Sequence, residues 1–152
     1  MKLEVYDLLL ASSGFAFEFI SVGPKGRIEK IVTYTEMKTP GFFNLGFGDK
    51  DPITKRMDDL SRSGNGDTDK VLATVVETLL RFTSLNPNAI VHAKGSTKAR
   101  NRLYQMGISK YLDDVNKNFK VYGFSTSGWE VFKKGIPYEA FMAHRLSFNT
   151  PT

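Results

Sequence analysis

The stretch GDTDKVLATVVETLL, residues 66–80, marks the point where the hydrophobic pattern of the chain changes from strand to helix. Its apolar side chains recur three and four positions apart, which predicts an amphipathic helix over about residues 68–83. These side chains are Val71, Leu72, Val75, Val76, Leu79 and Leu80. Asp67 or Thr68 is the expected N-cap, and the helix ends before Pro87.

The chain before this helix alternates with a period of two, which is typical of half-buried β-strands. Phe15, Phe17 and Phe19 alternate with a small and a charged residue and predict a first strand. The Gly-Pro-Lys-Gly turn at residues 23–26 leads into a second strand at residues 28–37, so the two form a hairpin. Further strands are expected at residues 42–47 and 57–61, joined by a polar loop at residues 48–56.

The chain after the helix combines short apolar runs with one further helix. That helix starts near Thr97 and has an apolar side formed by Tyr104, Ile108, Tyr111, Leu112 and Val115. Strands are expected at residues 89–94, 119–124, 129–132 and 141–146, and the turn at residues 125–128 joins the second and third of these as a hairpin. This order predicts an α+β fold, in which a largely antiparallel sheet of about five to seven strands carries two main helices on one face. We expect residues 1–152 to form a single domain, with residues 147–152 as a flexible tail.

The composition excludes several classes of chemistry. The chain has no cysteine, so disulfides, thiol catalysis and cysteine-ligated zinc are ruled out. Its two histidines, His92 and His144, are too few for a histidine-rich metal site. We therefore predict no metal and no cofactor. No apolar stretch has the length of a signal sequence or a membrane span, so the sequence predicts a cytoplasmic protein without a membrane partner.

Most of the formal net charge of +5 lies in residues 92–118, which hold six basic and two acidic residues. A strand, a Gly-Ser-Thr turn and a helix start follow one another there, and the backbone N–H groups of a helix N-terminus bind anions. Cations in the first turn oppose the helix dipole, so their presence favours an anionic partner. The candidate anion-binding residues are Lys94, Gly95, Ser96, Thr97, Lys98, Arg100 and Arg102.

A structural explanation of this basic segment remains open beside the functional one. Ser96 or Thr97 then caps the helix, while the lysines and arginines are solvated or pair with Asp113 and Asp114. At 100° per residue, Arg100 falls at the edge of the apolar side and Arg102 on the solvent side. Arg100 is therefore the arginine that we expect to be held in place.

A glycine inside the second helix, Gly107, predicts a close approach by another element or a kink. Glycine in a helix interior costs about 1 kcal/mol relative to alanine, so a packing reason is expected. A kink at this position would change the angular positions of Arg100 and Arg102 around the helix, which are calculated for a straight helix.

Aromatic residues gather in the last third of the chain, around its one tryptophan. Trp129, Phe132 and Tyr138 form a candidate aromatic surface, because aromatic side chains beside basic residues stack the bases of single-stranded nucleic acid. The alternative is that these side chains belong to the hydrophobic core.

Five motifs, spread over nearly the whole chain, resemble those of a bacterial family of short single-domain proteins of unknown function. They are GPKG at residues 23–26, NGDTDKVLAT at 65–74, KGSTKARNRLY at 94–104, GWE at 128–130 and YEAF at 138–141. The resemblance implies a single-domain, intracellular bacterial protein. It implies no activity, cofactor or catalytic residue.

Three functions are compatible with the sequence. The first is a binding module for an anionic partner, nucleic acid or a phosphorylated ligand, that uses the segment from Lys94 to Arg102. The second is a protein-interaction subunit of a small bacterial regulatory pair, which uses the aromatic last third. The third is an enzyme that acts on a phosphorylated substrate. It is the weakest of the three because no general base with a partner is apparent and no catalytic residue can be assigned. The oligomeric state is not predicted.

Overall fold

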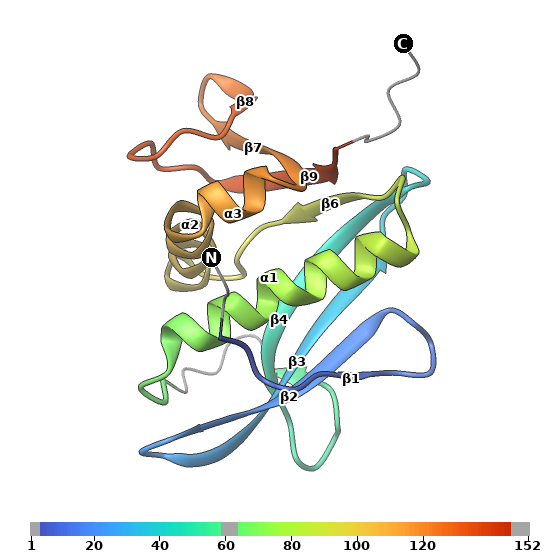
Figure 1. Ribbon diagram of the computed structural model, residues 1–152, viewed down its shortest axis with the longest axis vertical. Helices are drawn as coiled ribbons and strands as arrows, with labels where there is room; N and C mark the ends of the chain where they lie inside the picture. The colour runs from blue at the N-terminus through green and yellow to red at the C-terminus, as the bar shows by residue number, and fades with distance from the viewer. Residues whose placement is uncertain (1–3, 59–63, 147–152) are drawn as a thin grey trace.

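The computed structural model describes residues 4–58 and 64–146, and these form one mixed sheet with helices on one side (Figure 1). The strands are β1 (Leu9–Leu10), β2 (Ala16–Gly23), β3 (Gly26–Glu36), β4 (Phe42–Lys50), β5 (Met57–Asp58), β6 (Ile90–Ala93), β7 (Phe119–Ser125), β8 (Gly128–Val131) and β9 (Ala140–Arg145). The helices are α1 (Thr68–Leu85), α2 (Lys98–Lys110) and α3 (Leu112–Asn116). The α+β class is therefore confirmed.

The sheet runs in the order β1-β2-β3-β4-β6-β9-β7-β8, with β5 pairing beside β4. Eight strands in this order exceed the predicted five to seven. The hairpins β2–β3 and β7–β8 form where the sequence predicts them, and the pairing is antiparallel except between β4 and β6. Each of the eight segments expected to form a strand contributes to this sheet, and β1 is added to them; its two residues are too few to show a period.

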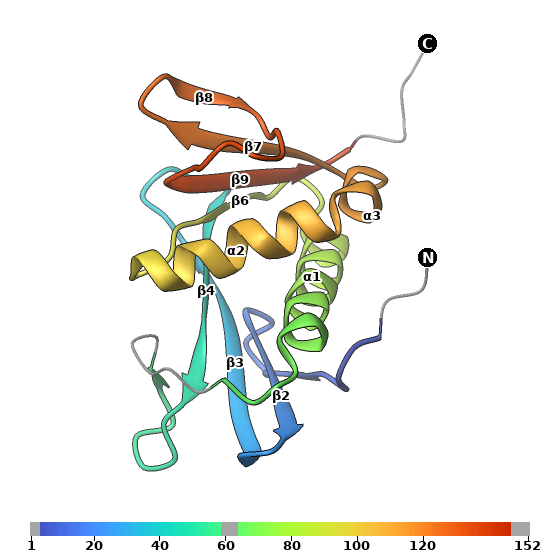
Figure 2. The same cartoon turned by 90° about the vertical axis from the view of Figure 1, so that its left-hand side faces the viewer.

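The helices cover one face of the sheet, as predicted (Figure 2). The second predicted helix, however, divides into α2 and α3 at Tyr111, whose backbone leaves the helical region. Tyr111 is buried and its hydroxyl donates to the carbonyl of Asp69 at 3.0 Å, which anchors the break to the start of α1. None of the helices in the described residues is long and apolar enough to cross a membrane.

The start of α1 is held by tertiary contacts instead of a side-chain cap. Asp67 occupies the N-cap position, but its side chain makes no capping hydrogen bond. Its carboxylate instead accepts hydrogen bonds from the hydroxyls of Tyr6 at 2.6 Å and Ser21 at 2.5 Å. Asp67 therefore ties the helix start to the N-terminal segment and to β2.

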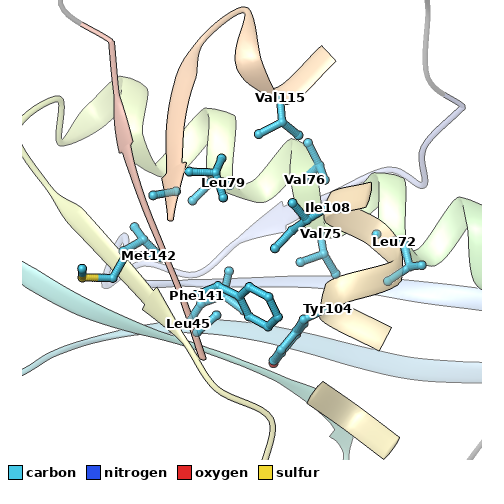
Figure 3. A pocket seen from close by; sticks show the side chains of 15 residues that line it. Leu45, Leu72, Val75, Val76, Leu79, Tyr104, Ile108, Val115, Phe141 and Met142 are labelled. Carbon is cyan, nitrogen blue, oxygen red and sulfur yellow. The ribbon is translucent and has the colours of Figure 1, made fainter. Parts of the chain in front are cut away.

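The core lies between the helices and the sheet and is rich in aromatic side chains. Tyr34 and Phe82 stack there with their ring centroids 4.1 Å apart. Gly107 permits the predicted close approach, because a Cβ at this position would lie 3.3 Å from a methyl carbon of Leu72 on α1. Next to this contact is a cavity of about 90 Å³, and its lining side chains from α1, α2 and the sheet are almost wholly apolar (Figure 3). It offers no polar group to an anion.

Two predicted segments differ in extent or fall outside the description. β4 continues to Lys50, so the polar loop begins later than expected, and Asp49 lies in a strand. Of the strand predicted at residues 57–61, Met57–Asp58 is formed, and the remainder lies outside the described residues. The predicted tail at residues 147–152 also lies outside them.

Candidate anion-binding groove

A groove of about 760 Å³ lies where α2 begins, between that helix and the chain that leads from β8 to β9. Its walls are Lys94, Gly95, Ser96, Thr97, Lys98, Asn101, Arg102, Gln105, Met106, Ser109, Gly135, Pro137, Tyr138 and Glu139. Six of the seven candidate anion-binding residues therefore line one surface. Arg100 does not.

The turn before α2 packs directly onto the helix backbone through Gly95. A Cβ at this position would lie 2.1 Å from the backbone nitrogen of Asn101, so only glycine fits. The Gly95 N–H donates to the side-chain oxygen of Asn101 at 3.0 Å. This contact fixes the position of the Gly-Ser-Thr turn relative to the first turn of α2.

Thr97 is the N-cap of α2, which confirms that one of the two predicted residues caps this helix. Its hydroxyl accepts the Arg100 N–H at 3.1 Å, and its carbonyl accepts the Asn101 N–H at 3.0 Å. The N–H groups of Lys98 and Ala99 belong to the same first turn, where no carbonyl within the helix can accept them. The groove therefore borders backbone donors at the positive end of the α2 dipole.

Asn101 and Gln105, which the sequence analysis did not single out, hold the two walls of the groove together. The Asn101 side chain donates to the carbonyl of Tyr138 at 2.8 Å, and the Gln105 side chain accepts the Tyr138 N–H at 2.9 Å and donates to the carbonyl of Ile136. The two amides lie four residues apart and so share one face of α2. The four-residue spacing can be seen in the sequence. The partners of the two amides cannot, because they lie more than 30 residues away.

The charges of the groove are mostly positive. Lys94, Lys98 and Arg102 are exposed, and within the described residues none of the three forms an ion pair. Asp114, one of the two acids proposed to neutralise them, pairs with Lys117 at 3.5 Å. Glu139 is the one carboxylate of the groove wall. Three cations thus face one acid beside the helix start.

Arg100 is buried and does not line the groove, unlike the other six candidate anion-binding residues. It is 9% exposed, and its guanidinium lies 5.1 Å from the centre of the Phe47 ring on β4. The Lys30 ammonium approaches the same ring to 5.9 Å and forms a buried ion pair with Asp49. The helical geometry that separates the two arginines explains the result, because Arg100 is on the side of α2 that faces the sheet.

Comparison with known proteins identifies the family. A family model matches residues 2–146. The chain belongs to DUF6934, a family of unknown function. No curated protein and no solved structure matches it.

The aromatic residues of this DUF6934 chain are divided between the surface and the core. Trp129 is 42% exposed, whereas Phe132 and Tyr138 are 6% and 4% exposed and belong to the core, as in the alternative given for these side chains. The Tyr138 ring covers Gly123, and its hydroxyl donates to the carboxylate of Glu130 at 2.5 Å. Phe132 and Tyr138 are buried because the chain between β8 and β9 folds back over the helix side of the sheet.

His92 is a second feature that the DUF6934 chain places close to the groove. It is half-buried on β6, its Nδ1 lies 3.4 Å from the side-chain oxygen of Asn44, and its ring centre lies 6.2 Å from that of Trp129. Burial and the nearby charge of Lys94 both lower the pKa of His92 from its ordinary value of 6.5. His92 is therefore neutral at neutral pH. In the described residues, no three His, Asp or Glu side chains come together as a metal site.

Proposed function

We propose that this protein is a binding module for a ligand that carries phosphate groups, and that the groove at the start of α2 is its binding site. The observation that carries the proposal is the convergence of six predicted residues on one groove, with three exposed cations and a helix N-terminus on the same wall. The proposal places the protein in a bacterial cytoplasm, where phosphorylated metabolites and nucleic acid are both available.

The arrangement suits a phosphate group for specific chemical reasons. A phosphate oxygen can accept hydrogen bonds from backbone N–H groups at a helix start, where the dipole also favours negative charge. Arg102 supplies a planar, two-pronged donor, while Lys94 and Lys98 act as mobile point charges at the rim. Because these cations have no ion-pair partner in the described residues, an incoming anion displaces no existing pair.

The other two functions have less support. A protein-interaction subunit would use the exposed Trp129, but its expected companions Phe132 and Tyr138 are buried. An enzyme would need a nucleophile or a general base at the groove. The nearest histidine, His92, is not among the residues of its wall.

Titration with inorganic tripolyphosphate, followed by calorimetry and by backbone amide NMR shifts, tests the proposal. We expect the largest shifts at Gly95, Ser96, Thr97 and Lys98. The double variant Lys98→Gln/Arg102→Gln should bind at least about tenfold more weakly, since a hydrogen bond to a charged group contributes about 1.5–3 kcal/mol. Lys25→Gln/Lys38→Gln removes two exposed charges elsewhere and should leave the affinity within about twofold. Shifts spread evenly over all basic segments would contradict the proposal.

A further inference from the structure

The four strands β6, β9, β7 and β8 have one face that no described helix covers, and we call it the open face. Side chains alternate between the two faces of a strand. Val91, Phe119 and Phe141 belong to the core on the helix side, so the side chains that alternate with theirs along β6, β7 and β9 point to the open face, as do the β8 residues paired with them. These include His92, Tyr122, Phe124, Trp129, Val131 and His144.

The rings on the open face form two contact groups. Trp129 lies 5.1 Å from Phe124 and 6.2 Å from His92 between ring centres. Tyr122 stacks on His144 with centres 5.8 Å apart and planes at 29°. Trp129 is the most exposed of these rings, while the others are half-buried and held by their neighbours. A planar base can thus be placed on Trp129 without disturbing the core.

The charge of the open face complements a polyanion. Lys120 is exposed there, at the position that pairs with His144. Within the described residues of these four strands, Glu130 is the one acid, and its side chain is on the helix side, bound to the Tyr138 hydroxyl. The open face of the four strands therefore carries rings and positive charge without a carboxylate.

Lys94 joins the open face to the groove. It lines the groove and directly follows β6, two residues after His92, whose ring contacts Trp129 edge-on. Its charge also acts on His92. A single extended ligand can therefore have phosphates at the groove and flat groups on the open face. A phosphorylated metabolite without a flat group has no second part to place there.

We propose that the ligand is single-stranded nucleic acid, with its backbone phosphates in the groove and one or two of its bases stacked on Trp129 and the neighbouring rings of the open face. This inference rests on the proposed function and names its substrate class. Aromatic platforms beside basic grooves bind single strands with little sequence preference, because every base has a π-face. A duplex keeps its bases stacked inside and cannot use Trp129. A second copy of this chain bound to the same face would place its own positive charges near Lys120 and Lys94, and these would repel one another.

Fluorescence anisotropy of a labelled oligothymidine of about ten nucleotides tests the inference, with a duplex of equal length and inorganic tripolyphosphate as comparison ligands. Trp129→Ala should weaken binding of the single strand at least about tenfold and leave the affinity for tripolyphosphate unchanged. Val131→Ala is the matched control. It truncates an exposed apolar side chain on the same strand and face, and should change the affinity less than about twofold. Quenching of Trp129 fluorescence by the single strand gives an independent readout.

The outcomes separate this inference from the proposed function. If tripolyphosphate binds at the groove but Trp129→Ala and wild type bind the oligonucleotide equally, the open face has no role, and only the phosphate site stands. Equal affinity for duplex and single strand would also overturn the inference. So would a dimer of the wild type that Trp129→Ala dissolves. If tripolyphosphate does not bind at the groove, the proposed function itself falls.

Discussion

At the scale of single residues, the two arginines of α2 show how one helical turn separates structure from function. Arg100 is buried against Phe47 close to the Lys30–Asp49 ion pair, while Arg102 is exposed on the groove wall. Both were candidates from the sequence, and only their angular positions on the helix distinguish them. The groove therefore depends on Arg100 for its position in the fold and on Arg102 for charge.

We expect Arg100→Ala to lower the free energy of unfolding by about 2–3 kcal/mol, because it removes a buried side chain and a desolvated cation–π contact. Arg102→Ala should change it by less than about 0.5 kcal/mol, since exposed substitutions cost little. Urea denaturation of both variants measures the difference. Equal costs for the two would show that Arg100 is not a structural residue of the core.

His92 reports on the electrostatics of the rim of the groove. Because its pKa is lowered in the folded protein, the folded state binds fewer protons than the unfolded state as the pH falls below about 6.5. The contribution of His92 to the free energy of unfolding is therefore fully present above pH 6.5. It is lost as the pH falls from 6.5 through the pKa that His92 has in the folded state. Replacing Lys94 with Gln removes one of the two causes and should raise the pKa of His92.

NMR titration of the imidazole protons checks this prediction directly, since the chain contains only two histidines to assign. Lys25→Gln, which removes a charge from the β2–β3 turn, is the control and should leave the pKa of His92 unchanged. An unchanged value in Lys94→Gln would mean that Lys94 does not act on His92. The link between the groove and the open face would then be lost.

At the scale of elements, the turn before α2 decides the shape of the groove. Gly95→Ala would place a methyl group against the backbone of Asn101, and neither backbone can yield without moving the turn from the helix. We expect a loss of stability of about 1–3 kcal/mol together with weaker tripolyphosphate binding. Gly64→Ala is the control, because a Cβ there meets nothing within 4 Å, and it should be tolerated. Normal binding by Gly95→Ala would contradict the role given to this turn.

Many of the helices, strands and turns could be predicted from the sequence. The change of period at residue 67, the two hairpins, the helix start at Thr97 and the close approach at Gly107 all follow from local patterns. The parallel pairing of β4 with β6 depends on contacts between distant segments and leaves no local signal. The same limit applies to Phe132 and Tyr138, because the chain between β8 and β9 folds back and buries them against distant segments.

The candidate site was predictable in composition but not in geometry. A turn with lysines and arginines at a helix start signals an anion site, and six of its seven residues line the groove. The opposite wall, with Tyr138 and Glu139, could not be assigned, since Asn101 and Gln105 bring it to α2 from more than 30 residues away. The break at Tyr111 was likewise hidden, because its cause is a hydrogen bond to α1.

At the scale of the whole molecule, the helices cover one face of the sheet and leave the other face of β6, β9, β7 and β8 uncovered (Figure 2). The groove lies where α2 meets the end of β6, so the basic segment and the open face come together at Lys94. Most of the net charge of +5 falls in residues 92–118, and three of the six cations of that segment line the groove. An electrostatic binding site of this kind should show a strong dependence on salt concentration.

The central claim is that the groove binds phosphate groups, and the salt dependence of tripolyphosphate binding tests it most directly. Two triple variants, each lacking three positive charges, should be compared with the wild type by calorimetry at several salt concentrations. Lys94→Gln/Lys98→Gln/Arg102→Gln removes the cations of the groove. Lys25→Gln/Arg27→Gln/Lys38→Gln removes exposed cations from β3 and from the connections on either side of it. We predict that the groove variant loses both the affinity and its salt dependence, and that the control keeps both. Equal losses in the two variants would contradict the claim, because binding would then follow net charge and not the groove.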